Sequence, residues 1–555
     1  MWLEETHLMT RALRRASAVP GVLVASLVAG CVFTSLGRTH ELAGEVRGLW
    51  AGAGEITVRV TSERETFLTS QSRNGEIAFT RGLPAGVAYT VTLEEVPEDH
   101  RCQVVAGASG VAQAEASEPI IITCVGPDAR VAFDSSWGWT FDATLDEQTF
   151  AGSVLTQEVR LLTASDEEGM TVQRDGQDVA LGELTVALPM GTTTVTLAFT
   201  RLDGLGRSYQ LVFERGAREI ELVKTLPASA QVRSLALEHG VLVFAARANG
   251  DNDAPLVTAH ERDGAGWSAG STRALTARDV NLGEQVFPLV IHKGIVSLVQ
   301  GRYIDQFTRT GPGIFTGRTD LISRSNAISS MVAADEDLYI WNRSGDAQVN
   351  CGVGDSPHTI RKLALRTTNY VDCVRPPLHQ TSSQAAVLAI NATNVFAIES
   401  GLDELHVTDR NLNQQTTLRP PNPVASFRDA LVAGPRLLAV RAAVAGGTVV
   451  QLFEAAGTGW SAGARLTPPV LEPGQTGSAT FGSALALRGD VLVAGEAAAQ
   501  GAAPGAVHVF RGGGASWAVA KSLAQAPANP SFGSMVVLAG DTLAVGSNTA
   551  VYVYR

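Results

Sequence analysis

Along most of the chain, apolar and polar residues alternate one by one, which is the pattern of a strand with one buried face. Val58 and Val60, for example, alternate with Arg59 and Thr61. Runs of this kind are short and are separated by turn signals such as Asn-Gly, Asp-Gly and single glycines. No long amphipathic helical period follows residue 40. The pattern therefore predicts an all-β protein.

Residues 40–126 form the first strand-rich segment. The Asn74-Gly75 pair precedes an alternating run and is typical of a β-hairpin turn. That pair, the phrase 44–49 and the two cysteines Cys102 and Cys124 resemble small bacterial β-sandwiches of the immunoglobulin-like, carboxypeptidase-regulatory kind. The resemblance implies an immunoglobulin-like β-sandwich over residues 40–126.

A second β segment covers residues 129–216. Its strand-like runs surround the turn signals Asp175-Gly176 and Asp203-Gly204, and the last two runs are long. This order of short strand, glycine turn and paired long strands resembles the cadherin-like β-sandwich repeats of bacterial surface proteins. It implies a second sandwich over 129–216, without the acidic cluster of a calcium site between domains.

The clearest internal repeat lies at the C-terminal end. The phrase that begins Phe481-Gly482 and continues through Gly489-Asp490 recurs 51 residues later, as Phe532-Gly533 and Gly540-Asp541. A weaker third copy begins near Phe427. A fixed period near 50 residues, built from three or four short strands, indicates the blades of a β-propeller.

The Phe-Gly and Gly-Asp-x-Leu phrases of this repeat resemble FG-GAP repeats, which occur in the head of integrin α-chains and in many bacterial surface proteins. The resemblance implies a propeller over residues 219–555. Strand runs of the repeat start near seven positions: Val232, Val286, Ala327, Ala385, Phe427, Phe481 and Phe532. We therefore expect a seven-bladed β-propeller preceded by two β-sandwich domains.

The last repeat stops at Arg555 after three strands, so its fourth strand has to come from elsewhere in the chain. The segment 220–226 ends in Lys224-Thr225-Leu226, which matches the Lys-hydroxyl-Leu order at 521–523 in the preceding repeat. We expect this segment to complete the last blade and close the ring, which would hide open strand edges. A linker strand outside the ring is the alternative.

The first 30 residues have the layout of a secretory signal peptide. Three arginines between Arg11 and Arg15 precede an apolar run, 16–29, that is too short to span a bilayer, and small residues lead to Cys31. This order resembles the lipobox of bacterial lipoproteins, in which the cysteine becomes the lipid-bearing N-terminus. An ordinary signal peptide with a chance cysteine is the alternative.

The lipobox resemblance implies a lipoprotein signal peptide over 1–30, a linker over 31–39 and export to the cell envelope. Lipid on Cys31 would hold the protein to a membrane. Val32 follows where inner-membrane lipoproteins of some bacteria carry Asp, so we expect the outer membrane or the cell surface.

The other four cysteines fall into two local pairs, Cys102 with Cys124 and Cys351 with Cys373, each 22 residues apart. Two disulfides leave no cysteine over besides Cys31, which suits an oxidising compartment. Zinc is the alternative, but it needs four clustered ligands.

Net charge and the distribution of acidic residues limit the classes of partner that the protein could bind. The net charge of −12 argues against binding nucleic acid by neutralising phosphates. Asn249, Asp251 and Asp253 concentrate oxygen ligands in one loop and are weak calcium candidates. A solvated turn is the alternative there, and we expect no other metal or cofactor.

The repeats argue against a catalytic role for the two serines that local sequence alone would suggest. Ser268 and Ser461 each lie in a Gly-x-Ser-x-Gly phrase, the nucleophile elbow of α/β-hydrolases. The phrase occurs at equal positions of two repeats, which favours a turn into an outer strand over catalysis. Trp137 and Trp139 offer rings for sugar stacking, with core packing as the alternative.

Together these patterns predict a non-catalytic protein: a lipid tether, two sandwiches as a stalk, and a propeller whose loops bind a protein or glycan, in adhesion or as a scaffold. This step goes from fold to role by analogy. The alternative is a glycan-acting enzyme that uses the propeller's central face.

Overall fold

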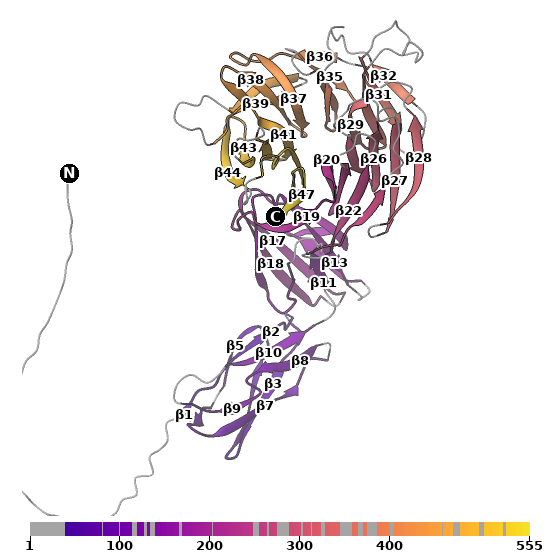
Figure 1. Cartoon of the computed structure of the whole chain (residues 1–555). Coiled ribbons are helices and arrows are strands. Elements are labelled where there is room, and N and C mark those ends of the chain that lie inside the picture. The colour runs from indigo at the N-terminus through magenta and orange to yellow at the C-terminus, as the bar shows by residue number, and fades with distance from the viewer. Residues whose placement is uncertain are drawn as a thin grey trace, which may run out of the picture.

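The computed structural model contains strands and turns and no helix among the residues that it describes, which confirms the predicted all-β class (Figure 1). It describes residues 39–555 except for 51, 80, 99, 114–118, 127–129, 134–138, 166–168, 203, 248–254, 264–265, 275–287, 301–302, 312–313, 323–327, 344–357, 365–369, 375–385, 400–403, 414, 458, 470–477, 499–503 and 525–528. None of the described residues forms a helix of the length and apolarity that a membrane span requires. The predicted signal peptide and Cys31 lie outside the described residues.

The first domain packs two four-stranded sheets, of order β5-β2-β10-β8 and β4-β3-β7-β9, with a short β1-β6 pair. Its strands are β1 (Thr39–His40), β2 (Ala43–Arg47), β3 (Ile56–Ser62), β4 (Thr66–Gln71), β5 (Gly75–Ala78), β6 (Leu83–Pro84), β7 (Ala88–Glu95), β8 (Arg101–Ala106), β9 (Ser109–Val111) and β10 (Ile120–Val125). Alternate apolar residues such as Val60 and Ile122 fill the core between the sheets, as in a β-sandwich.

The hairpin predicted at Asn74-Gly75 is wrong. The strands on either side, β4 and β5, belong to different sheets, so the segment crosses between the sheets instead of folding back. The side-chain oxygen of Asn74 accepts a hydrogen bond from the Leu49 amide, 2.8 Å away. An Asn-Gly pair supports this crossing equally well, because its turn chemistry does not specify the partner strand.

The second domain is a sandwich of a three-stranded sheet, β11-β13-β16, and a five-stranded sheet, β12-β18-β17-β14-β15. The strands are β11 (Arg130–Phe133), β12 (Glu147–Gly152), β13 (Glu158–Ala164), β14 (Thr171–Arg174), β15 (Gln177–Val179), β16 (Gly182–Ala187), β17 (Gly191–Thr200) and β18 (Gly206–Arg215). The predicted long strands pair as the β17–β18 hairpin. Trp139 packs against Phe133, Phe150 and Phe213 as part of the core, while Trp137 lies outside the described residues.

The rest of the described chain forms seven sheets arranged as a ring (Figure 1). We number them as blades in chain order and call the strands of each blade A to D from the centre outwards. Blade 1 holds β20 (Gln231–Glu238), β21 (Val241–Arg247), β22 (Leu256–Asp263), β23 (Gly266–Trp267) and β24 (Ser271–Ala274); blade 2 holds β25 (Leu289–His292), β26 (Ile295–Gln300), β27 (Tyr303–Gly311) and β28 (Ile314–Ile322); blade 3 holds β29 (Ile328–Ala334), β30 (Asp337–Arg343), β31 (His358–Ala364) and β32 (Tyr370–Val374).

Blade 4 holds β33 (Ala386–Ile390), β34 (Asn394–Glu399), β35 (Leu405–Asp409) and β36 (Gln415–Leu418); blade 5 holds β37 (Ser426–Ala433), β38 (Leu437–Val444), β39 (Gly447–Ala456) and β40 (Gly459–Leu466); blade 6 holds β41 (Phe481–Arg488), β42 (Val491–Glu496), β43 (Ala506–Gly513) and β44 (Ser516–Ala524). Blade 7 holds β45 (Met535–Ala539), β46 (Thr542–Gly546), β47 (Ala550–Tyr554) and β19 (Leu222–Pro227). Each A strand contacts the next, and β45 contacts β20. These contacts close the circle.

The last blade is completed by the N-terminal strand β19, as the sequence predicts. Thr225 lies opposite Tyr552 and Leu226 opposite Val551, the register that Ser522 and Leu523 keep on β43 of blade 6. The backbone groups of Glu221 and Arg555 exchange two further hydrogen bonds, of 2.9 and 3.0 Å. The closing strand therefore follows directly from the second sandwich.

The Phe-Gly phrase sets how closely neighbouring blades approach. Phe481 and Phe532 are fully buried at the start of their repeats, and the glycines after them adopt positive φ angles of 75° and 85°. A Cβ on Gly495 would lie 2.0 Å from the carbonyl oxygen of Gly533 in the next blade. The small residues of the repeat thus allow backbone contact between blades 6 and 7.

Candidate functional site

The Gly-Asp phrases of the repeat form the A–B turns of blades 6 and 7. Gly489 and Gly540 have φ angles of 53° and 60°, which favour glycine, and an aspartate follows each of them. Because neighbouring strands of a blade are antiparallel, the A–B and C–D turns lie on one face of the ring and the B–C and D–A loops on the other. Asp490 and Asp541 therefore lie on the A–B face.

Asp490 binds the second sandwich. Its two carboxylate oxygens accept hydrogen bonds of 3.0 and 2.6 Å from the guanidinium of Arg215, at the end of β18. The same guanidinium donates to the carbonyl oxygens of Val154 and Leu188. Arg215 is only 3% exposed, so the sandwich core holds the donor in place. A bidentate pair of this kind fixes orientation as well as distance.

Further contacts join the same two domains. Gln157 donates to the carbonyl oxygen of Arg488, and the Arg488 guanidinium donates back to Glu158 over 2.8 Å. Leu155 is fully buried within the apolar cluster that blades 6 and 7 share. On the outer strand, Lys521 pairs with Glu219 of the connecting segment. The sandwich thus docks through both polar and apolar contacts.

A cleft of about 480 Å³ lies beside this junction. Its walls come from β13 of the sandwich and from the A–B turns of blades 1, 6 and 7. The charged side chains around it include Glu158, Arg160, Glu238, Arg262 and Asp541. Both signs of charge therefore line this cleft.

The charges in the cleft are largely satisfied by one another. Asp541, almost fully buried, accepts from Arg262 of blade 1 at 2.7 Å and from Arg555 after β47. Burial lowers the pKa of Arg555, and the carboxylate of Asp541 counteracts part of that effect. Arg488 is bound to Glu158 and to the Gly540 carbonyl. The arrangement supports domain docking and ring closure.

The A–B face continues as a belt of contacts between neighbouring blades. Glu238 of blade 1 accepts from the amide of Lys293 over 3.1 Å and lies 3.4 Å from Nδ1 of His292, both in blade 2. Nε2 of His292 lies 2.9 Å from the Asp335 carbonyl oxygen in blade 3. The carboxylate of Asp335 pairs in turn with Arg410 of blade 4. These contacts tie the turns of four blades together.

The Glu238–His292 pair shifts the pKa of both groups. The hydrogen bond with Glu238 raises the pKa of His292, while burial opposes this change. Burial alone would raise the pKa of Glu238, but hydrogen bonds from His292 and from the backbone amides of blade 2 bring it below its usual value. The charged pair is therefore favoured at mildly acidic pH.

A hydrogen-bonded chain in blade 6 has the residue types of a serine triad. Nδ1 of His508 lies 2.9 Å from the Ser522 hydroxyl, and Nε2 lies 2.9 Å from the Glu496 carboxylate. In blade 1, Thr258 and Thr272 form a 3.0 Å hydrogen bond at the same C-to-D register position. A polar pair that recurs at this position indicates cross-strand support in the outer half of a blade.

The two Gly-x-Ser-x-Gly serines also make cross-strand contacts. The hydroxyl of Ser268 accepts from the amide of Glu261 over 2.8 Å. The hydroxyl of Ser461 lies in β40, opposite Glu454, and contacts its carbonyl oxygen over 3.5 Å. Ser268 lies in the link between the antiparallel strands β23 and β24, and Ser461 lies within β40, whereas a nucleophile elbow needs a strand-turn-helix context.

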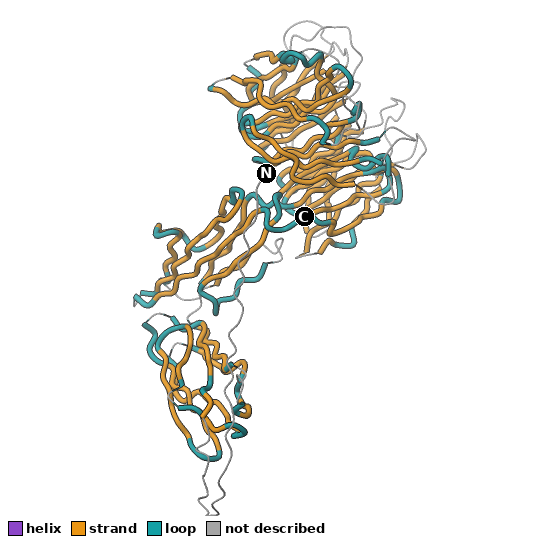
Figure 2. The backbone as a smooth tube through the Cα atoms, turned by 90° about the vertical axis from the view of Figure 1, so that its left-hand side faces the viewer, coloured by secondary structure: helices purple, strands orange, loops and turns teal. Residues whose placement is uncertain are grey.

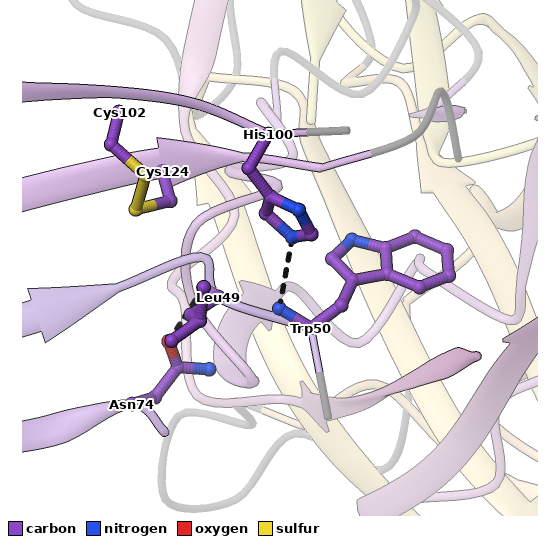
Figure 3. The surroundings of a disulfide bond; sticks show 6 residues. All are labelled: Leu49, Trp50, Asn74, His100, Cys102 and Cys124. Atoms are coloured by element: carbon purple, nitrogen blue, oxygen red, sulfur yellow. Dashed lines mark hydrogen bonds between the residues drawn. A yellow bond between two sulfur atoms is a disulfide. The ribbon is translucent and has the colours of Figure 1, made fainter. Parts of the chain in front are cut away.

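The structure places only some of the other predicted site residues. Cys102 and Cys124 lie opposite each other on β8 and β10 and form a disulfide (Figure 3). The predicted partner of Cys373, Cys351, and the calcium candidates Asn249, Asp251 and Asp253 lie outside the described residues. Among the described residues, no group of three or more His, Cys, Asp or Glu side chains is placed to hold a metal.

Sequence reasoning missed the junction between the second sandwich and the propeller. The pairing of Arg215 with Asp490 joins residues 275 positions apart, and neither is unusual in its local pattern. Arg215 ends a strand of alternating polar and apolar residues, so its position next to a predicted domain boundary gives no sign of its partner.

Comparisons with known proteins find matches among solved structures alone. No family model and no curated protein matches the sequence. Among solved structures, the chain is similar to the WD40 β-propeller domain of Doa1, at 12% identity and a TM-score of 0.41 over 61% of this chain and 97% of that one. It is also similar to the Pan2 WD40 domain of Neurospora crassa, at 10% identity and a TM-score of 0.38 over 61% and 95%. A third similarity, to Kuenenia stuttgartiensis hydrazine synthase, has 10% identity and a TM-score of 0.38 over 57% and 94%.

Proposed function

We propose that this protein holds a β-propeller away from an envelope membrane and uses the loops of one propeller face to bind a protein or a glycan, without catalysis. The observation that carries the proposal is the docking of the second sandwich through Arg215 and Asp490 on the A–B face. That docking leaves the opposite face, with the B–C and D–A loops, for a ligand.

The contacts described above support this division of the two faces. Polar contacts from the sandwich reach Arg488 and Asp490 at an A–B turn and Lys521 on the outer strand β44. The A–B face also carries the belt of inter-blade contacts. The A–B face, which carries these contacts, attaches the propeller to the second sandwich. Loops on the opposite face are free to vary in sequence, as binding loops on rigid scaffolds do.

Attachment at the other end of the chain completes the proposal. The lipobox resemblance at Cys31 supports a lipid anchor, and the FG-GAP and sandwich resemblances support an extracellular binding role. One acyl chain binds a membrane only weakly, whereas the several chains typical of bacterial lipoproteins would anchor it stably. The two sandwiches then act as the stalk between lipid and propeller.

The test measures ligand binding by detergent-extracted full-length protein on a glycan array and on a panel of purified envelope proteins. Ala425→Arg and Thr549→Arg place a bulky charge on exposed positions of D–A and B–C loops. Ala392→Arg makes the matched change at an exposed A–B turn. The proposal is supported if Ala425→Arg and Thr549→Arg lose binding of a ligand that the parent protein and Ala392→Arg both retain.

Two outcomes reject it. If Ala392→Arg abolishes binding while the loop variants retain it, the A–B face is the binding face. If the purified protein hydrolyses envelope polysaccharide, the non-catalytic role is wrong and the enzyme alternative replaces it.

A further inference from the structure

A tryptophan of the first sandwich is buried in the core of the second. Trp50 follows β2 and is 1% exposed, within a cluster that includes Val131 and Tyr209. Its backbone amide donates a 3.2 Å hydrogen bond to Nε2 of His100, which belongs to the first sandwich (Figure 3). Trp50 thus connects the two sandwiches, which follow one another in the arm below the propeller (Figure 2).

The Cys102–Cys124 disulfide joins the two strands whose ends hold Trp50. His100 stands directly before β8, and Gly126 directly follows β10. A Cβ on Gly126 would lie 2.3 Å from the Trp50 ring and 2.7 Å from the His100 ring, so the three residues are in close contact. In Figure 3 the His100 side chain points toward Trp50, beside the disulfide.

Strand β8 needs this covalent link more than its neighbours do. It is the edge strand of the sheet β5-β2-β10-β8 and pairs only with β10. Its pairing with β10 is also interrupted by a register shift next to Ile121. Edge strands that are held on one side open more easily than central ones. Without the disulfide, the start of β8 could move away from β10 and take His100 with it.

We propose that the Cys102–Cys124 disulfide is a lock on the angle between the two sandwiches. With the bond intact, β8 and β10 hold Trp50 in the second sandwich and the arm is rigid. When a dithiol supplies two electrons and two protons, two cysteine thiols form, the dithiol becomes a disulfide, and the joint becomes a hinge. Asn74 of the first sandwich still donates a 3.0 Å hydrogen bond to Asp146 of the second, whose carboxylate Arg207 holds from within the same sandwich, and this contact serves as the pivot.

On the proposed function, this lock sets how far the propeller reaches from its anchor. The test itself needs no ligand, so its failure leaves the binding proposal intact. Spin labels on an unnatural ketone amino acid at the exposed positions Leu68 and Leu181, one on each sandwich, report the distance between the domains in the full chain.

The expected result is a narrow distance distribution for the parent protein and a broad one for the double variant Cys102→Ala/Cys124→Ala. Trp50→Ala, with the disulfide intact, should broaden the distribution to a similar extent, and dithiothreitol should then broaden it little further. Thr66→Ala, at an exposed position at the start of β4, is the control and should keep the narrow distribution.

Two results overturn the proposal. The first is a narrow, unchanged distribution in the double cysteine variant when near-ultraviolet circular dichroism shows both sandwiches folded. The second is unfolding of the first sandwich by the double substitution while Trp50→Ala stays narrow, since the disulfide would then support only the fold.

Discussion

Arg215 of the second sandwich and Asp490 of blade 6 form a two-pronged ion pair that joins domains far apart in sequence. The arginine is buried, while the aspartate is about one third exposed. Arg215 ends β18, and only residues 216–221 separate it from the closing strand β19. The contact that docks the second sandwich on the propeller and the strand that closes the ring are therefore adjacent in the chain.

Removal of the negative charge at Asp490 tests the docking contact. Asp490→Asn removes the negative charge beside the buried Arg215 and leaves one side-chain oxygen to accept its hydrogen bonds, so we expect the free energy of unfolding to fall by about 2 kcal/mol, less than for a fully buried pair. Urea unfolding followed by tryptophan fluorescence measures the loss. Glu404→Gln removes the partner of the exposed Arg419 and, as the control, should cost less than about 1 kcal/mol.

The closing strand gives a second prediction. Leu226 of β19 is buried in the core shared by blades 1 and 7, so Leu226→Ala should destabilise the propeller by about 3 kcal/mol. Val223→Ala, at an exposed position of the same strand, should change stability by less than about 0.5 kcal/mol. Equal effects of the two changes in urea unfolding would contradict the packing of β19 in the ring.

Backbone contact between blades 6 and 7 gives a third prediction. Gly495→Ala forces a Cβ against the Gly533 carbonyl, so we expect a loss of about 1–3 kcal/mol in unfolding free energy. A Cβ on Gly513, also in blade 6, meets nothing within 4 Å, and Gly513→Ala is the control with a change below about 0.5 kcal/mol. An unchanged melting profile for Gly495→Ala would show that the blades are further apart.

The Glu238–His292 contact predicts a pH dependence. His292 has a raised pKa, so its contribution is complete below its ordinary pKa of 6.5 and is lost as pH rises through the raised value. Glu238 has a lowered pKa, so its contribution is present above 4.5 and is lost as pH falls through the lowered value. The stability lost in His292→Gln should therefore be largest between about pH 4.5 and 6.5.

Thermal unfolding of parent and variant across pH 4 to 9 measures this difference. The comparison variant is His239→Gln, at a largely exposed histidine next to Glu238, and His292→Gln should give the larger loss in the mildly acidic range. A difference for His292→Gln that stays constant with pH would show that the blades are not linked through a charged pair.

Much of the fold could be predicted because it repeats. The recurring Phe-Gly and Gly-Asp phrases predict the blades, and the match between 224–226 and 521–523 predicts the register of the closing strand that the structure shows. Because the same sequence phrases recur in several blades, a strong copy of the repeat makes the assignment of a weaker copy more secure. The Asn74-Gly75 error has the opposite cause: a turn signal identifies a change of direction and leaves the partner strand undetermined.

The candidate site was largely beyond sequence reasoning. The junction around Arg215 depends on the side of the ring against which the sandwich rests, and no local pattern encodes that choice. Nothing in the sequence around Trp50 indicates that its side chain is buried in the core of the other sandwich. Contacts between domains join residues without a common period, and a single sequence therefore gives no signal for them.

The most direct test of the account is hydrogen exchange at the amides of β47 in the full chain and in a chain that begins at residue 229, after β19. The ring closure described here predicts strong protection of Val551 and Val553 in the full chain and its loss in the shortened one, with blade 4 amides protected in both. Equal protection of β47 in the two chains would contradict closure by β19.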